Sequence, residues 1–203
     1  MGGRAGAEPG GLNHEHGGHR PPAPATFEES DLAPFAALNV HPLVVETLGS
    51  TPTRAQSDAM VERYGAELER EGWGFWAVEV VGGAHFIGMV GLHRVHPTIP
   101  CAPGVEAGWR LHPDWWGHGY ATEGAAASLH YGFTTGGLSD IVAFTAAVNL
   151  RSQAVMERIG MVRQPDGDFD HPGVAVGSPL RRHLLYRATP SHTEPHLPRT
   201  LIG

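Results

Sequence analysis

The sequence contains no lysine, a single cysteine and no long apolar segment. All fourteen basic residues are arginine, and because lysine codons are rich in adenine, this composition points to a GC-rich genome. Cys101 has no second cysteine to pair with, which excludes an internal disulfide framework. A transmembrane helix needs about twenty consecutive apolar residues, and the first residues lack the apolar core of a signal peptide. These absences predict a cytoplasmic protein that does not enter a membrane.

Charge is also scarce in this chain. Charged residues make up 17% of the sequence, the formal net charge is −7 and the isoelectric point is about 6.0. A protein that binds nucleic acid or an anionic membrane needs a basic face, so neither partner is expected. The hydrophobic fraction of 41% over 203 residues is enough for one domain with a sizeable core.

The two ends of the chain differ in composition from its centre. Residues 1–26 are rich in glycine, proline and histidine without an apolar period, and residues 189–203 contain three prolines and few apolar side chains. Both segments are therefore predicted to be flexible tails. The fold is expected within residues 27–188.

Between the tails, the hydrophobic pattern alternates between helical and strand periods. Helices are predicted over residues 31–39, 53–71, 120–133 and 150–159. Strands are predicted over 74–81 and 85–95, as a hairpin around Gly82 and Gly83, and over 105–111, 141–147, 161–163 and 183–187. This order of elements indicates a mixed α/β or α+β fold.

Gly117 and Gly119 lie between the predicted strand 105–111 and the predicted helix 120–133. Free N–H groups and the helix dipole attract anions at a helix N-terminus, and a glycine lets a phosphate approach the backbone. The pattern predicts a phosphate-binding loop. The alternative is an ordinary tight turn, because this pattern alone has low specificity.

Several motifs, taken in their order and spacing, resemble the GNAT acetyltransferase superfamily and its RimJ/RimL-like branch. The resemblance covers roughly residues 30–188. It is carried by Glu106 to Leu111, Trp116-Gly-His-Gly-Tyr-Ala-Thr-Glu123, Asn149-x-x-Ser152, Val155-Met-Glu-x-Ile-Gly-Met161 and, upstream, Trp76-Ala-Val and Ile87-Gly-Met-Val-Gly-Leu92.

The resemblance implies an α/β (α+β) GNAT fold: a central, twisted, mostly antiparallel sheet, splayed between its fourth and fifth strands and flanked by helices. It also implies acetyl-CoA as co-substrate, bound in the wedge between those strands. The pantetheine arm would lie along Trp109, Arg110 and Leu111. The pyrophosphate would accept hydrogen bonds from the segment formed by Trp116, Gly117, His118, Gly119, Tyr120 and Ala121.

Asn149 and Ser152 begin the predicted helix 150–159. From the sequence alone, Asn149 is a typical helix N-cap, and Ser152 faces solvent or bonds back to the helix. The resemblance adds a hydrogen bond from Asn149 to the pantetheine arm and places Ser152 near the thioester sulfur. Most other GNAT branches have a tyrosine there, and a serine is a weaker acid.

The resemblance implies an N-acetyltransferase, in which a primary amine attacks the thioester directly within a ternary complex. A general base must remove the ammonium proton, and backbone N–H groups can polarise the carbonyl. Glu106 is the candidate base, because burial beside an apolar site would raise the pKa of its carboxyl usefully. The alternative is a surface carboxylate without a role in the reaction.

Asp170, His171 and His183 are predicted to bind the acceptor from a loop and the last strand. Their spacing matches no closed zinc pattern, and thioester transfer needs no metal, so no metal is expected. The acceptor is a protein N-terminus or a small-molecule amine, which the fold does not distinguish. A catalytically idle acyl-CoA-binding or regulatory module is the alternative function. A monomer or a homodimer is expected.

The family pattern begins with a strand before the first helix, and this sequence departs from it there. Residues 18–26 are rich in proline, which suits an edge strand at best. Two alternatives follow: the first strand is present as an edge strand, or it is lost through an upstream reading-frame error.

Overall fold

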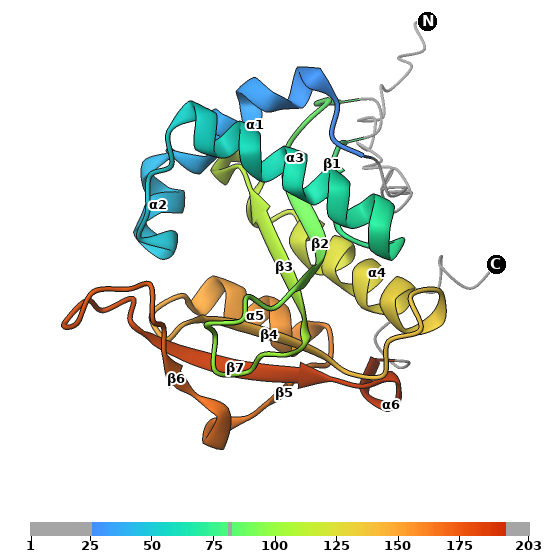
Figure 1. The fold of residues 1–203 in the computed structure, drawn as a ribbon, viewed down its shortest axis with the longest axis vertical. Helices are drawn as coiled ribbons and strands as arrows, with labels where there is room; N and C mark the ends of the chain where they lie inside the picture. Colours follow the sequence, from blue (N-terminus) through green and yellow to red (C-terminus); the bar gives the residue numbers. More distant parts are fainter. Residues whose placement is uncertain (1–25, 81–82, 194–203) are drawn as a thin grey trace, which may run out of the picture.

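The computed structural model describes residues 26–80 and 83–193. Most of both predicted tails, the segment of the expected first strand and the tip of the predicted hairpin lie outside the described residues. Figure 1 shows the arrangement of the elements. Among the described residues, no helix combines the length and apolar character needed to cross a membrane.

One mixed sheet of seven strands organises the chain. The strand order is β1-β2-β3-β4-β7-β5, and β6 pairs with β7 beside this path. The strands are β1 (Phe75–Val78), β2 (Gly88–Arg94), β3 (Val105–Leu111), β4 (Ile141–Ala146), β5 (Val162–Arg163), β6 (Phe169–Asp170) and β7 (Arg182–Ala188). All pairs are antiparallel except β3 with β4.

The sheet is splayed between β3 and β4. The two parallel strands share one paired position, Glu106 with Val142, and Figure 1 shows β3 running steeply while β4 and β7 run across the lower part of the molecule. This confirms the predicted splay of the sheet. The family scheme counts a strand before the first helix, in the part of the chain that is not described, so its fourth and fifth strands are labelled β3 and β4 here. The strands labelled β4 and β5 are separated by β7.

The helices are α1 (Leu32–Asn39), α2 (Pro42–Leu48), α3 (Arg54–Glu71), α4 (Tyr120–Thr134), α5 (Leu150–Arg158) and the short α6 (Pro190–Thr193). Helix α3 shows how local sequence fixes an element. The hydroxyl of Thr53 accepts from Gln56 N–H while the Gln56 side chain accepts from Thr53 N–H, a capping box. At the other end, Gly72 adopts the left-handed conformation (φ 75°) that commonly ends a helix.

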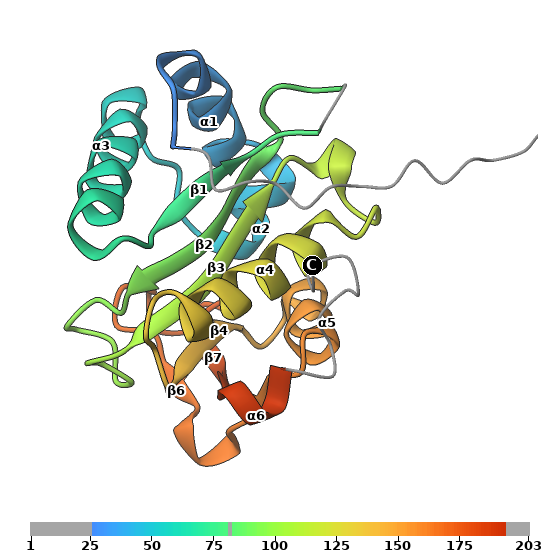
Figure 2. The same ribbon diagram turned by 90° about the vertical axis from the view of Figure 1, so that its right-hand side faces the viewer.

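The helices cover the two faces of the sheet (Figure 2). Helices α1 and α3 lie over one face of β1–β3, where Phe35, Tyr64 and Phe75 form a small buried cluster. Helix α4 covers the opposite face and packs on Val90 and Leu92 of β2 within the main core. Side chains along β3 therefore alternate between these two layers, which separates Glu106 and Arg110 on one face from Trp109 and Leu111 on the other.

The observed elements differ from the predicted ones at the hairpin and at three elements that were not predicted. The hairpin strands expected over 74–81 and 85–95 pair with each other only over Phe75–Val78 and Gly88–Gly91, and the rest of β2 pairs with β3 alone. Helix α2 and the short strand β6 were not predicted. Helix α6 lies within the predicted tail 189–203 and follows β7 directly.

Candidate active site

The edge of β3 that faces β4 is open along most of its length. On β2, Leu92 N–H donates to the carbonyl of Gly74, next to β1. The backbone groups of the next residue, His93, therefore point toward β3, where His93 pairs with Glu106. Because backbone direction alternates along a strand, Ala107 and Trp109 present their N–H and C=O groups to the opposite edge. Since β4 meets β3 at one position only, an extended ligand can pair there as an additional strand would.

A cleft of about 1220 Å³ occupies the wedge beside this edge. It extends from α2, past β3 and the loop before α4, to α5 and the segment before β7. Of the residues predicted to form the site, those that line the cleft are Glu106, Trp109, Arg110, Leu111, Trp116, Gly117, Gly119, Tyr120, Ala121, Asn149, Ser152, His171 and His183. The structure thus brings most of the predicted residues together.

His118 and Asp170 lie apart from the cleft lining. His118 is exposed, and its ring stacks on Tyr120 with centroids 5.9 Å apart. Asp170 is exposed as well, and its carboxylate pairs with Arg181 at 3.2 Å and with Arg182 at 3.8 Å. An acceptor would have to compete with these two arginines for the Asp170 carboxylate.

The loop before α4 has the backbone shape of an anion site. Gly117 and Gly119 have φ values of +81° and +90°, in the left-handed region that favours glycine. A Cβ at either position would find no atom within 4 Å, so the space above this backbone is open. Gly119 is the N-cap of α4, and the N–H groups and dipole of a helix N-terminus favour an anion.

Trp116 forms one wall of the loop. Its indole N–H donates to the carbonyl of Leu111 at 2.8 Å, which fixes the loop against the end of β3. The guanidinium of Arg151, at the start of α5, lies 4.3 Å from the Trp116 ring centroid in a cation–π contact. Arg151 thereby brings a positive charge to the cleft beside the glycine loop.

Glu106 is a half-buried carboxyl at the point where β3 and β4 part. Burial raises the pKa of Glu106 to about 7, because the charged form loses hydration; nearby His93 lowers the pKa and Glu67 raises it. His93 is held in a short hydrogen bond to the buried Glu67. A carboxyl with a pKa near 7 is suited to accept a proton at neutral pH.

Asn149 caps α5 as predicted from the sequence. Its side-chain oxygen accepts from Ser152 N–H at 3.2 Å, and its Nδ2 donates to Ser152 Oγ at 3.1 Å. Because Ser152 Oγ accepts this bond, its own O–H is available to donate toward the cleft. Gly160 follows the helix with φ +80°, the left-handed conformation that commonly ends a helix.

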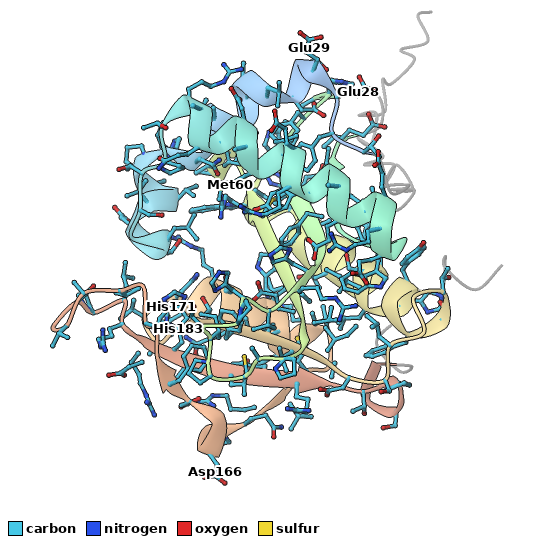
Figure 3. The ribbon with its side chains drawn as sticks, in the orientation of Figure 1. Glu28, Glu29, Met60, Asp166, His171 and His183 are labelled. Atoms are coloured by element: carbon cyan, nitrogen blue, oxygen red, sulfur yellow. The ribbon has the colours of Figure 1, made fainter. Side chains whose placement is uncertain are left out.

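His171 and His183 lie together on the lower wall of the cleft, and Figure 3 shows them side by side, with Asp166 far from both. Their ring centroids are 4.8 Å apart, and the Phe169 ring stacks on His183. Burial lowers the pKa of both imidazoles, and for His171 the neighbouring His183 lowers it further. The pair is therefore mostly neutral at pH 7.

Helix α2 supplies part of the cleft that the sequence analysis missed, through Val44, Thr47 and Leu48. The signals for this helix were present, because Pro42 occupies its first turn and Gly49 follows it in the left-handed conformation. Gly49 lies close to the side chain of Leu180 from the loop before β7, and Leu180 also lines the cleft. The pairing of His93 with Glu67 was also missed, since it joins residues distant in sequence.

Among residues 26–80 and 83–193, no group of three or more histidine, cysteine, aspartate or glutamate side chains is placed to hold a metal ion.

Comparison with known families identifies the chain's relatives. A family model described as an acetyltransferase (GNAT) domain matches residues 25–162, which is more than half of the chain. The FsC-acetyl coenzyme A-N(2)-transacetylase of Aspergillus fumigatus is 41% identical over 115 residues, covering 49% of this chain and 49% of that protein. The chain thus spans about half the length of this curated relative.

Solved structures share the fold. The spermidine N-acetyltransferase of Vibrio cholerae, in complex with CoA and spermine, aligns with a TM-score of 0.65 and 20% identity, over 83% of this chain and 95% of that chain. RimJ of Mycobacterium smegmatis, in complex with CoA-disulfide, aligns with a TM-score of 0.63 and 19% identity, over 83% and 81%.

Proposed function

Because the chain belongs to the GNAT acetyltransferase family, within its RimJ/RimL-type group, we propose that it transfers an acetyl group from acetyl-CoA to a primary amine. The observation that carries this proposal is the position of Glu106. Its carboxyl, with a pKa of about 7, lies where the open edge of β3 begins, and the glycine loop lies at the far end of the same edge.

Acetyl-CoA supplies an activated acyl group as a thioester. The residues fit its two polar parts: the open edge of β3 offers N–H and C=O groups to the pantetheine amides, and the loop at Gly117 and Gly119 offers N–H groups to the pyrophosphate. Trp109 and Leu111 line the cleft along this path, and Asn149 lies opposite them at the start of α5.

The acceptor amine must lose a proton to become nucleophilic. Glu106, as carboxylate, takes this proton from the ammonium group, and the neutral amine then attacks the thioester carbonyl. As the carbon–sulfur bond breaks, Ser152 O–H donates a hydrogen bond to the departing sulfur, and the proton that the attacking nitrogen loses is transferred to the thiolate to give the free CoA thiol. A free thiol has a pKa of about 8.5, so the departing thiolate needs only limited stabilisation.

The acceptor side of the cleft is formed by α2, the pair His171 and His183, and the loop that carries Leu180. It is open enough for a peptide N-terminus or a small amine. The Aspergillus relative is named for transfer to FsC and the Vibrio neighbour for spermidine, so amines of several kinds are reasonable acceptors.

The test is release of free CoA thiol from acetyl-CoA with a panel of amines, including peptides with varied N-termini, together with calorimetric titration of CoA. We expect CoA binding and thiol release that depends on an amine. CoA binding without release against any amine would indicate an idle acyl-CoA-binding module. Absence of CoA binding would exclude both functions.

A further inference from the structure

Arg110 lines the cleft from β3 without an acidic partner. Its Nη1 donates to Asn39 Oδ1 from the end of α1, while its Nε is buried and has no hydrogen-bond acceptor. In the part of the chain that the structure describes, no carboxylate lies within ion-pair distance of its guanidinium. This is an unusual state for an arginine, since buried charges in proteins are normally paired.

The surroundings of Arg110 hold it in place without neutralising it. Asn39 and Ser57 are fully buried and hydrogen-bonded to each other at 3.1 Å, so the Asn39 amide is fixed with its oxygen toward the guanidinium. The Phe35 ring lies 6.0 Å away. Burial lowers the pKa of Arg110 because the guanidinium loses hydration, and the nearby Tyr64 opposes this shift.

Arg110 shares a face of β3 with the candidate base. Glu106 and Arg110 are four residues apart, so both side chains leave the same side of the strand. Their Cα atoms are separated by about 13 Å. Both line the cleft, which allows one extended molecule to approach Glu106 with one end and Arg110 with the other.

The charges around the cleft divide between its two sides. Glu123, Arg151 and Arg158 enter it from α4 and α5, beside the glycine loop. On the side of α2 and β3, the described lining residues carry one acid and one permanent cation, Glu106 and Arg110. Helix α2 contributes only neutral side chains, and His171 and His183 are mostly neutral at pH 7.

We propose that Arg110 binds a carboxylate of the acceptor, so that the acceptor class is an amino acid or short peptide with a free acid group rather than a polyamine. The planar guanidinium fork matches a carboxylate, and such hydrogen bonds are stronger than neutral ones. The amine of the same molecule would lie at Glu106. This inference rests on the proposed acetyl transfer and specifies its substrate.

The test uses pairs of amines that differ only in charge at the far end. Di-, tri- and tetraglycine are compared with their C-terminal amides, and spermidine is added as a polycation. The readout is kcat/KM for thiol release at pH 8. We expect the wild-type protein to favour the acid over the amide by about 10- to 100-fold for at least one length, and to use spermidine poorly.

Substitution of the arginine isolates its contribution. In Arg110→Gln the preference for the acid should fall to near one, mainly through KM, while the Kd for CoA stays unchanged. Arg54→Gln, at an exposed arginine of α3, should keep the wild-type ratio. A retained preference in Arg110→Gln, a weakened CoA affinity, or a wild-type ratio near one would each overturn the inference.

A binding measurement keeps the inference testable if Arg110→Gln does not fold or no glycine peptide is acetylated. In the wild-type protein saturated with CoA, N-acetylglycylglycine should raise the Tm more than its amide does, and the difference should shrink in high salt. Equal shifts would contradict the role of Arg110. Lack of any CoA-dependent shift would instead contradict the proposed acetyl transfer.

Discussion

His93 on β2 and Glu106 on β3 face each other directly in the antiparallel pair. His93 is in turn bonded to the buried Glu67 of α3, so three titratable side chains from three elements lie in one row. The pKa values of Tyr64 and Cys101 are raised chiefly by burial, and the Glu106 carboxylate raises both further. The proton affinity of the candidate base is therefore set by α3 and β2 as well as by β3.

The first prediction concerns Glu106→Gln, which keeps the shape of the side chain but cannot accept a proton. The wild-type rate should fall below about pH 7 as Glu106 becomes protonated. The rate deficit of the variant should therefore be largest above pH 7, at about 10²- to 10⁴-fold, and shrink at lower pH. Rate measurements from pH 5.5 to 9 check this, with the exposed Glu69→Gln as control. Identical pH profiles would exclude Glu106 as the base.

The same substitution should stabilise the fold at alkaline pH. The pKa of Glu106 is raised from 4.5 to about 7, so the folded state binds this proton more tightly than the unfolded state. That stabilisation is fully present below pH 4.5 and is lost as the pH rises through 7. At pH 8, Glu106→Gln should exceed wild type in free energy of unfolding by up to about 3 kcal/mol. Urea denaturation at pH 4.5 and 8 tests this, and an equal difference at both values would refute it.

His93→Gln should move the acidic limb of the rate profile to higher pH. Burial and Glu67 raise the pKa of Glu106, and the imidazole of His93 lowers it, so loss of the imidazole should raise this pKa further. CoA affinity should not change. His96→Gln, at an exposed histidine just after β2, serves as the matched control. An unshifted limb, or a shift to lower pH, would show that His93 does not tune the base.

Gly119→Ala should weaken CoA binding beyond any effect on stability. Its positive φ makes an alanine cost about 1–2 kcal/mol, and the new Cβ would enter the open space above the loop. Gly72→Ala provides the comparison, because Gly72 has a similar φ of +75° and equally open space, but at the end of α3. Both variants should lose similar stability and only Gly119→Ala should lose CoA affinity. Equal CoA affinities would remove the phosphate-loop assignment.

Ser152→Ala separates a catalytic hydroxyl from a structural one. The helix cap uses the backbone N–H of Ser152 and the side chain of Asn149, so α5 should remain intact. Without the hydroxyl as donor to sulfur, turnover should fall by roughly tenfold to a hundredfold, with CoA affinity nearly unchanged. Turnover and the calorimetric Kd for CoA, measured on the same samples, distinguish the two roles, with Ser139→Ala at an exposed serine as control. Wild-type turnover in Ser152→Ala would leave the residue without a catalytic role.

Elements with strong local signals were predictable from the sequence. The strand Val105–Leu111 matches its predicted range, and α3 begins and ends at the cap residues that its sequence indicates. The left-handed turns of the loop before α4 follow from two glycines between a strand and a helix. In each case the information lies within a few consecutive residues.

The missing parts of the site depend on register and on contacts between distant segments. Arg110 is hydrogen-bonded to Asn39, 71 residues away in the sequence, and His93 is hydrogen-bonded to Glu67, 26 residues away. No local sequence pattern therefore predicts either pair. The sequence predicted only that the strand segment containing Arg110 lies beside the pantetheine arm. In the structure, the side chain of Arg110 extends from β3 toward α1. Only the pairing of β2 with β3 assigns each side chain to a layer.

The single bridge between β3 and β4 also has a mechanical consequence. It leaves two sub-sheets, β1–β3 and β4–β7, which α4 joins through its contacts with β2, β3 and α5. A ligand bound in the wedge contacts both sub-sheets at once and so holds them in a fixed relative position. We expect the empty protein to flex about α4 as a hinge, and hydrogen exchange along the facing edges of β3 and β4 to slow together when CoA binds. In such a fold, the bound ligand supplies the contacts that make the two sub-sheets rigid relative to each other.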